Sequence, residues 1–217
     1  MSVVKTFIKL ILGRGVYRSY SVSGEDLVIL PFIPGGYESY PNSIGGFYVD
    51  VGCYHPILYS NTYRLYKNGW KGIVIDPNRR LWKLFRIFRP RDHFIQAAIG
   101  SDKGERTYFS FEDEAYNTLD PVCVEKYKLK TKLIGSYPVT ICSLTEVLRG
   151  INHIDLLNID VEGLDLEVLQ SYDWKVKPRV IIIEAMPGSF VSKFLDAKGY
   201  KLVGLTRLNS IFLLDKR

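Results

Sequence analysis

The sequence has few cysteines and no long apolar run. Its three cysteines, Cys53, Cys123 and Cys142, are odd in number and widely spaced, which argues against a disulfide framework and against a Cys-rich zinc site. The longest apolar run near the start, in residues 7–12, is interrupted by a lysine, is too short to span a bilayer and lacks a cleavage-site pattern. We therefore expect a cytoplasmic protein without a transmembrane segment, in a reducing compartment.

The length and composition indicate one globular domain. The chain has 217 residues, of which 47% are hydrophobic and 24% charged, enough for one substantial core without disulfides or metals. A formal net charge of +6 favours anionic partners without choosing among them. We expect the local basic clusters to be solvated surface charge; they are Arg79 and Arg80, then Arg86, Arg89 and Arg91, then Lys126, Lys128, Lys130 and Lys132.

Residues 1–20 differ from the rest of the chain, residues 21–217, in their pattern. Val4, Phe7, Ile8 and Ile11 recur at helical spacing among basic residues, which predicts a peripheral amphipathic helix. Its apolar face has three alternatives: the domain, another subunit of a homo-oligomer, or weak contact with a membrane surface; we expect packing. After it, Ser23 is predicted as an N-cap with Asp26 three residues later.

From residue 47 the pattern alternates between strands and helices. Strands are predicted at 47–52, 71–76, 93–99, 155–160, 180–184, 200–206 and 210–214, and helices at 61–67, 81–88, 144–149, 164–172 and 190–198. Apolar strands alternating with helices indicate an α/β fold, with a mostly parallel sheet covered on both faces and a C-terminal antiparallel hairpin. Residues 101–143 interrupt this pattern; strands are predicted at 107–111 and 138–141, and a lid or substrate loop at 117–135.

Acidic residues recur where the predicted strands end. Open α/β sheets bind ligands at the carboxyl ends of their strands, and a buried acid is costly unless it is paired. The strand ends carry Asp50 with Gly52, then Asp76, Gln96 to Ala98, Asp160 with Glu162, and Glu184. This recurrence predicts a ligand site at the carboxyl edge of the sheet.

The first two strand ends indicate the kind of cofactor. Gly52 allows a close approach of the backbone, and Asp76, 26 residues after Asp50, is placed to accept both ribose hydroxyls of an adenosine group. The dinucleotide fingerprint G-x-G-x-x-G is absent, so no second glycine admits a pyrophosphate. A cofactor with adenosine but without phosphates is expected, and S-adenosylmethionine is that cofactor.

Several segments, in this order, resemble the FkbM family of methyltransferases. They are Ser23 to Asp26, Tyr48 to Pro56, Ser60 to Thr62, Gly69 to Pro77, Gln96 to Gly100 and Leu157 to Gly163, followed by Glu167 to Leu169. The resemblance covers roughly residues 20–215 and implies a class I, Rossmann-like methyltransferase fold with a seven-stranded sheet. It also implies S-adenosylmethionine as methyl donor and O-methylation of a sugar, glycan or secondary metabolite. The glycine-rich turn of many members is replaced here by Cys53, Tyr54, His55 and Pro56.

The expected cofactor contacts follow the strand ends. Asp50 and Gly52 are assigned to the methionine end together with Ser60 and Asn61, Asp76 to the ribose, and Gln96 to Ala98 to the adenine. The full cofactor-binding set is Asp50, Gly52, Cys53, Ser60, Asn61, Asp76, Gln96, Ala97, Ala98 and Asp160.

A general base is expected to take the proton of the acceptor hydroxyl. The catalytic candidates are Asp160, Glu162, Glu184 and His55. The alternative for His55 is a capping or packing role, and for Glu162 a hydrogen bond to a helix N-terminus. A Mg²⁺ site formed by Asp160, Glu162 and Glu184 is the alternative role of these acids, and we favour it less than base catalysis.

Other classes of function remain open from the sequence. The expected partner is a small-molecule or glycan acceptor, which the basic clusters allow to be phosphorylated or anionic. A nucleic-acid methyltransferase fits the net charge, but the Asn/Asp-Pro-Pro-aromatic motif is absent, since Ile159 to Gly163 stands in its place. A non-catalytic scaffold that binds an adenosine cofactor is the other alternative.

Overall fold

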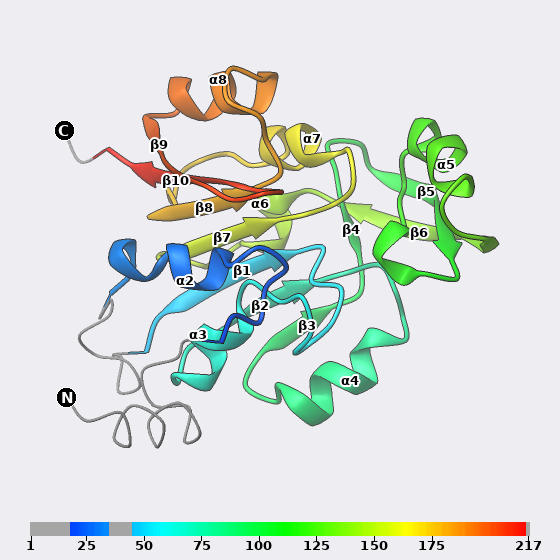
Figure 1. Ribbon diagram of the computed structural model, residues 1–217, viewed down its shortest axis with the longest axis horizontal. Coiled ribbons are helices and arrows are strands. Elements are labelled where there is room, and N and C mark those ends of the chain that lie inside the picture. Colours follow the sequence, from blue (N-terminus) through cyan, green and yellow to red (C-terminus); the bar gives the residue numbers. More distant parts are fainter. Residues whose placement is uncertain (1–17, 35–44, 216–217) are drawn as a thin grey trace, which may run out of the picture.

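The structure is a computed structural model, which describes residues 18–34 and 45–215. A seven-stranded sheet forms its centre (Figure 1). The strand order is β3-β2-β1-β7-β8-β10-β9, and neighbouring strands from β3 to β8 run parallel, whereas β10 is antiparallel to both β8 and β9. The bounds are β1 (Phe47–Val51), β2 (Lys71–Ile75), β3 (His93–Ile95), β7 (Leu156–Ile159), β8 (Val180–Ile183), β9 (Tyr200–Leu205) and β10 (Ser210–Leu214). This sheet confirms the predicted class I fold, its mostly parallel strands and its C-terminal hairpin.

The apolar strands fill two cores, one on each face of the sheet. In β8, Ile181 and Ile183 point into one core, whereas Val180 and Ile182 point into the other. This two-residue alternation explains why the central strands are apolar throughout, since both of their faces are buried.

Helices cover both faces (Figure 1). Residues of α2 (Glu25–Val28), η1 (Leu30–Phe32), α3 (Tyr63–Lys67) and α4 (Leu81–Phe88) pack into one core, and those of α6 (Leu144–Val147), α7 (Asp165–Gln170) and α8 (Phe190–Ala197) into the other. In residues 18–34 and 45–215, no helix is both long and apolar enough to cross a membrane.

A second sheet has three strands, and in this part of the chain two predictions, the strand at 93–99 and the loop at 117–135, are wrong in part. The strand predicted at 93–99 ends at Ile95, and β4 (Ala98–Ile99) instead pairs with β6 (Leu133–Cys142), which also pairs with β5 (Gly104–Phe111). The physical reason is that β2 ends at Ile75, opposite Ile95, so the chain has no further partner in the large sheet. The predicted loop at 117–135 is also wrong in part, because it contains the helix α5 (Pro121–Lys128), preceded in the chain by η2 (Glu114–Tyr116). Asp120 caps α5 through its side chain, with Pro121 following, a start signal present in the sequence.

The start of the described chain also differs from prediction. Ser23 is not the cap of α2; Gly24 is, in a left-handed conformation and without a side-chain cap. Asp26 is instead fully buried and pairs with the buried Arg64 at 2.9 Å, because a buried guanidinium needs a carboxylate. The predicted N-terminal helix lies outside the described residues as far as residue 17, and residues 18–20 are not helical.

Candidate active site

The carboxyl end of β1 carries a buried hydrogen-bond network around Asp50. One carboxylate oxygen accepts from Thr62 Oγ1 at 2.5 Å, and the other from Asn158 Nδ2 at 2.8 Å. Asn61 Nδ2 in turn donates to Asn158 Oδ1 at 2.9 Å. The predicted residues Asp50 and Asn61 are therefore brought together by Asn158 on β7. Asn158 was not predicted as a site residue, although it lies within the segment that resembles the family.

Ser60 belongs to the same region through a buried cation. Its hydroxyl accepts from Arg89 Nη1 at 3.2 Å, and Thr62 Oγ1 accepts from Arg89 Nη2 at 3.0 Å. The prediction of Arg89 as solvated surface charge is wrong, because its side chain is 0% exposed. Its charge is balanced by Asp92, whose carboxylate lies 2.6 Å from Nε.

The ion pair of Arg89 and Asp92 has further hydrogen-bond partners for its remaining donors and acceptors. Tyr48 donates to Asp92 at 2.6 Å and accepts from Arg89 Nη2 at 2.8 Å. A buried ion pair is tolerated only when its remaining donors and acceptors are satisfied, as they are here. Arg89 therefore fixes the segment that carries Ser60 and Thr62 against the end of β1.

Gly52 is required by a close approach between two strand ends. A Cβ atom at this position would lie 1.8 Å from the carbonyl oxygen of Asp160, and the residue has a φ of +78°. Both conditions exclude a larger residue. The glycine thus lets the turns after β1 and β7 meet, whereas the sequence suggested that it admits a ligand.

Asp76, the residue after β2, is buried and forms no ion pair with a cation of the described part of the chain. Its two oxygens accept from the backbone amides of Asn78 at 2.8 Å and Tyr54 at 3.1 Å. Burial is the main cause that raises its pKa to about 6, and the two amides oppose that shift. Each oxygen keeps accepting capacity, so the carboxylate fits the paired hydroxyls of a ribose. Beside it, burial raises the pKa of the Cys53 thiol well above its usual value.

Gln96, Ala97 and Ala98 lie where the chain passes from β3 to β4. Gln96 is exposed, whereas Ala97 and Ala98 are buried. Ala98 packs against Tyr108 and Val139 of the small sheet. The predicted adenine-binding segment therefore connects the two sheets. It follows β3, the strand that pairs with β2.

Acidic residues gather after β7 and β8. Asp160 is half-buried, and loss of hydration, then the negative charges of Glu162, Asp165 and Glu184, raise its pKa well above the usual range. Burial, together with the negative charge of Glu184, also raises the pKa of Asp165 to about 7. The three predicted acids are thus electrostatically coupled. The prediction missed Asp165, whose signal was a further acid five residues after the strand-end Asp160.

Asp165 differs from the other acids in its surroundings. The residue is buried at the first position of α7, and its Oδ1 has no hydrogen-bond partner among the described residues. A buried oxygen without a partner is rare in folded proteins. The unpartnered Oδ1 of Asp165 indicates that this cluster can accept a hydrogen bond or a positive charge from a bound molecule.

The small sheet and α5 contact the acidic cluster. Tyr127 of α5 donates to the carboxylate of Glu162, and Thr118 Oγ1 donates to the Glu162 carbonyl at 3.1 Å. Burial raises the pKa of Glu162, and the bond from Tyr127 opposes that rise. The ring of Tyr127 is buried, as is that of Tyr108. Neither ring is therefore free to stack on a ligand.

His55 holds its own loop. Its Nδ1 accepts from the backbone amides of Ile57 at 3.1 Å and Leu58 at 2.9 Å. Partial burial lowers its pKa, so the ring is neutral near pH 7, with its proton on Nε2. This arrangement is the capping role considered as the alternative, and it leaves no free lone pair on the ring for base catalysis.

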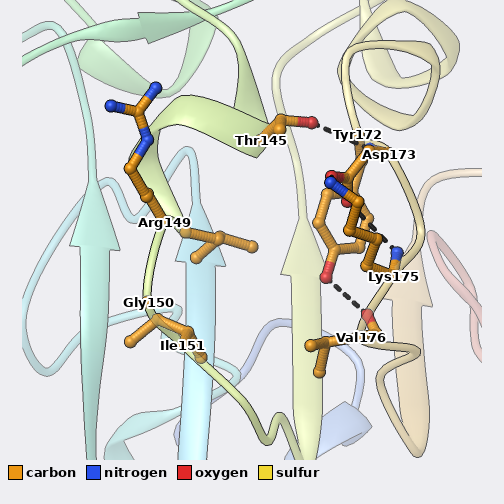
Figure 2. A pocket seen from close by; sticks show the side chains of 9 residues that line it. Thr145, Arg149, Gly150, Ile151, Tyr172, Asp173, Lys175 and Val176 are labelled. Atoms are coloured by element: carbon orange, nitrogen blue, oxygen red, sulfur yellow. Dashed lines mark hydrogen bonds and ion pairs between the residues drawn. The ribbon is translucent and has the colours of Figure 1, made fainter.

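A cavity of about 370 Å³ lies away from these residues (Figure 2). Its walls include Thr145 and Arg149, which precede β7, and Tyr172 and Lys175, which precede β8. It therefore lies toward the amino ends of the strands and contains none of the predicted site residues. In residues 18–34 and 45–215, no group of three or more His, Cys, Asp or Glu side chains is placed to hold a metal ion.

Comparison with known proteins identifies the family. The model of the methyltransferase FkbM domain matches residues 50–202, more than half of the chain, while no curated protein matches. A crystal structure of a precorrin-6y C5,15-methyltransferase from Geobacter metallireducens GS-15 is similar at 14% identity, with a TM-score of 0.41, over 88% of this chain and 86% of that one. The matched span contains Asp50, Asp76, Asp160 and Glu184. The chain belongs to the FkbM family of methyltransferases, whose methyl donor is S-adenosylmethionine.

Proposed function

We propose that this methyltransferase transfers the methyl group to a hydroxyl of a sugar, glycan or secondary metabolite. The observation that carries the proposal is the cluster of coupled carboxylates after β7 and β8, where loss of hydration and the negative charges of Glu162, Asp165 and Glu184 raise the pKa of Asp160. A hydroxyl must lose its proton on methylation, and a base is most effective when its pKa lies near the working pH.

Residues at the ends of β1 and β2 bind the cofactor in this proposal, and the acids after β7 and β8 bind the acceptor. Asp76 accepts from the ribose hydroxyls, and Asp50, with Asn61 and Asn158, shapes the end of β1 against which the methionine part binds. S-Adenosylmethionine supplies an electrophilic methyl group when bound. One ionised carboxylate among Asp160, Glu162 and Glu184 accepts the proton of the acceptor hydroxyl, while the others accept hydrogen bonds from neighbouring hydroxyls of a polyol.

A second cavity, at the small sheet, supports a small polar acceptor, although none of the clustered acids lines it. It measures about 480 Å³, within the usual range for small-molecule sites, and lies between β5 and the segment before α5. Thr107, Phe109 and Asp120 line it, and so does Leu164, two residues after Glu162. Lys126 and Lys130 act electrostatically on Glu162, so a phosphate or carboxylate on the acceptor would find positive charge close by.

The test is a methyl-transfer assay across nucleotide sugars and glycans, with product detection by mass spectrometry. Asp160→Asn, Glu162→Gln and Glu184→Gln are compared with Asp196→Asn, an exposed acid on α8. We expect at least one of the three to lose about 10²-fold in rate while binding S-adenosylhomocysteine normally. Near-normal turnover in all three, on an established acceptor, would show that the base lies elsewhere.

A further inference from the structure

The helix α4 exposes large apolar side chains, two on its outer part and one, Phe88, at its last position. Ile87 is 68% exposed, Phe88 47% and Trp82 44%, whereas Leu81 and Phe85 face the core. Ile87 and Lys83 are four residues apart, as are Arg86 and Trp82, so they share the outward face of the helix. Exposure of three large apolar residues on two turns of one helix is unusual for a solvated surface.

The segment that contains α4 is strongly basic, and Lys83 and Arg86 lie on the outward face of the helix itself. No acidic residue occurs in the sequence between Asp76 and Asp92, while this stretch holds Arg79, Arg80, Lys83, Arg86, Arg89 and Arg91. Of these, Arg89 is buried and the other five are exposed. The carboxylate of Asp92 is buried against Arg89 and therefore does not offset the exposed charges. Arg80 reaches Glu114 at 3.4 Å, an exposed pair of little energetic weight.

A neighbouring loop extends this surface. Arg89, at the end of α4, donates to the carbonyl of Pro56 at 3.4 Å, which places the loop after β1 against the carboxyl end of the helix. On that loop Leu58 is 58% exposed and Tyr59 60%. Apolar side chains therefore continue beyond α4 toward the loop whose Tyr54 amide contacts Asp76.

We propose that α4 and the 56–60 loop form a docking surface for an anionic lipid bilayer. Exposed cations are attracted by acidic headgroups, while Trp82 and Ile87 insert at the boundary between headgroups and acyl chains. A nucleic acid would satisfy the charges equally well, but an aliphatic side chain such as Ile87 has no π-face on which a base can stack. This inference is independent of the acceptor proposed above, because it concerns a different face of the molecule.

Flotation of the full chain with vesicles tests the proposal. The vesicles consist of phosphatidylcholine alone or of phosphatidylcholine mixed with phosphatidylglycerol. Lys83→Gln removes one cation from α4, and Ile87→Ser removes its most exposed apolar side chain. Lys193→Gln is the matched control, an exposed lysine on α8, which covers the opposite face of the sheet. Circular dichroism and S-adenosylhomocysteine binding check that each variant is folded.

We expect binding to the anionic vesicles only, weakened by added salt. Lys83→Gln should reduce the partition coefficient about fivefold, equivalent to about 1 kcal/mol for one cation near the surface. Ile87→Ser should reduce it about tenfold through lost apolar burial, and Lys193→Gln should bind as the wild type does.

Three results would overturn the proposal. One is no binding to anionic vesicles. Another is an equal loss in Lys83→Gln and Lys193→Gln, which would reflect only the net charge of the chain. The last is binding that neither Lys83→Gln nor Ile87→Ser weakens. If such binding is lost on deletion of residues 1–17, those residues and not α4 are responsible for it. An RNA oligomer that binds more tightly than vesicles, with an affinity unchanged by Ile87→Ser, would assign the surface to nucleic acid and also refute it.

Discussion

Asp76 offers the sharpest test of the cofactor site, because its protonation and its proposed role are linked. Its pKa of about 6 means that the free protein carries this side chain mainly neutral at pH 5 and mainly ionised at pH 7. Ribose hydroxyls donate to the ionised form. Binding of S-adenosylhomocysteine should therefore weaken about tenfold from pH 7 to pH 5, in proportion to the ionised fraction. Asp76→Asn should lose this part of the pH dependence.

The substitution should also weaken binding at neutral pH. Two hydrogen bonds to a charged acceptor become bonds to a neutral amide, a loss of about 1.5–3 kcal/mol, or roughly 10-fold to 150-fold in Kd. Isothermal titration calorimetry from pH 5 to pH 8 measures both effects. If Asp76→Asn binds with wild-type affinity at neutral pH, or keeps the tenfold pH dependence, Asp76 is not the ribose acceptor.

Stability provides the control for this experiment. The folded-state pKa of Asp76 is raised from 3.8 to about 6, so the folded chain binds more protons than the unfolded chain between these values. This side chain therefore lowers stability as pH rises from about 4 to about 6, by up to about 3 kcal/mol. Asp76→Asn removes that cost but leaves one of the two donating amides without an acceptor, at about 1–3 kcal/mol. The two terms offset, so urea unfolding at pH 7 should change little.

Three further substitutions test the framework around the site. Gly52→Ala should destabilise the fold by more than about 3 kcal/mol, measured by thermal unfolding, since the new methyl group meets the carbonyl of Asp160, the residue after β7. Arg89→Met should cost about 3–5 kcal/mol in urea unfolding by leaving Asp92 buried without its cation, and a smaller loss in the double variant with Asp92→Asn would confirm the pairing. Tyr127→Phe removes a bond that lowers the pKa of Glu162, so if Glu162 is the base, the acidic limb of the pH–rate profile should move to higher pH; an unmoved limb would exclude that role.

The strand-end acids could be located from the sequence because their positions are fixed locally. A short apolar run sets where a strand ends, and the next residue must then lie at the carboxyl edge of a parallel sheet. Asp76 and Asp160 follow this rule, whereas Asp50 is the last residue but one of β1; the structure places all three near the carboxyl edge. The pairing of β7 with β8 was likewise implied by their order in the chain, and it couples Asp160 to Glu184.

The buried partners could not be found this way, because exposure is decided by contacts far apart in the sequence. Arg89 has the local pattern of a surface arginine at a helix end, yet Tyr48, Ser60 and Thr62 enclose it. Its burial depends on how α4 packs against the loop after β1.

The end of β3 likewise depends on contacts between residues far apart in the sequence. Residues 93–99 contain Phe94 and Ile95 near their start and Ile99 at their end, and these strand-favouring residues predict one continuous strand. A strand continues only while a neighbour supplies hydrogen-bond partners, and β2 ends opposite Ile95. The sequence by itself determined the alternation of strands and helices and the acids at the strand ends. Only the tertiary structure decided which backbone groups found partners, and therefore where the chain left one sheet for the other and which charges were buried.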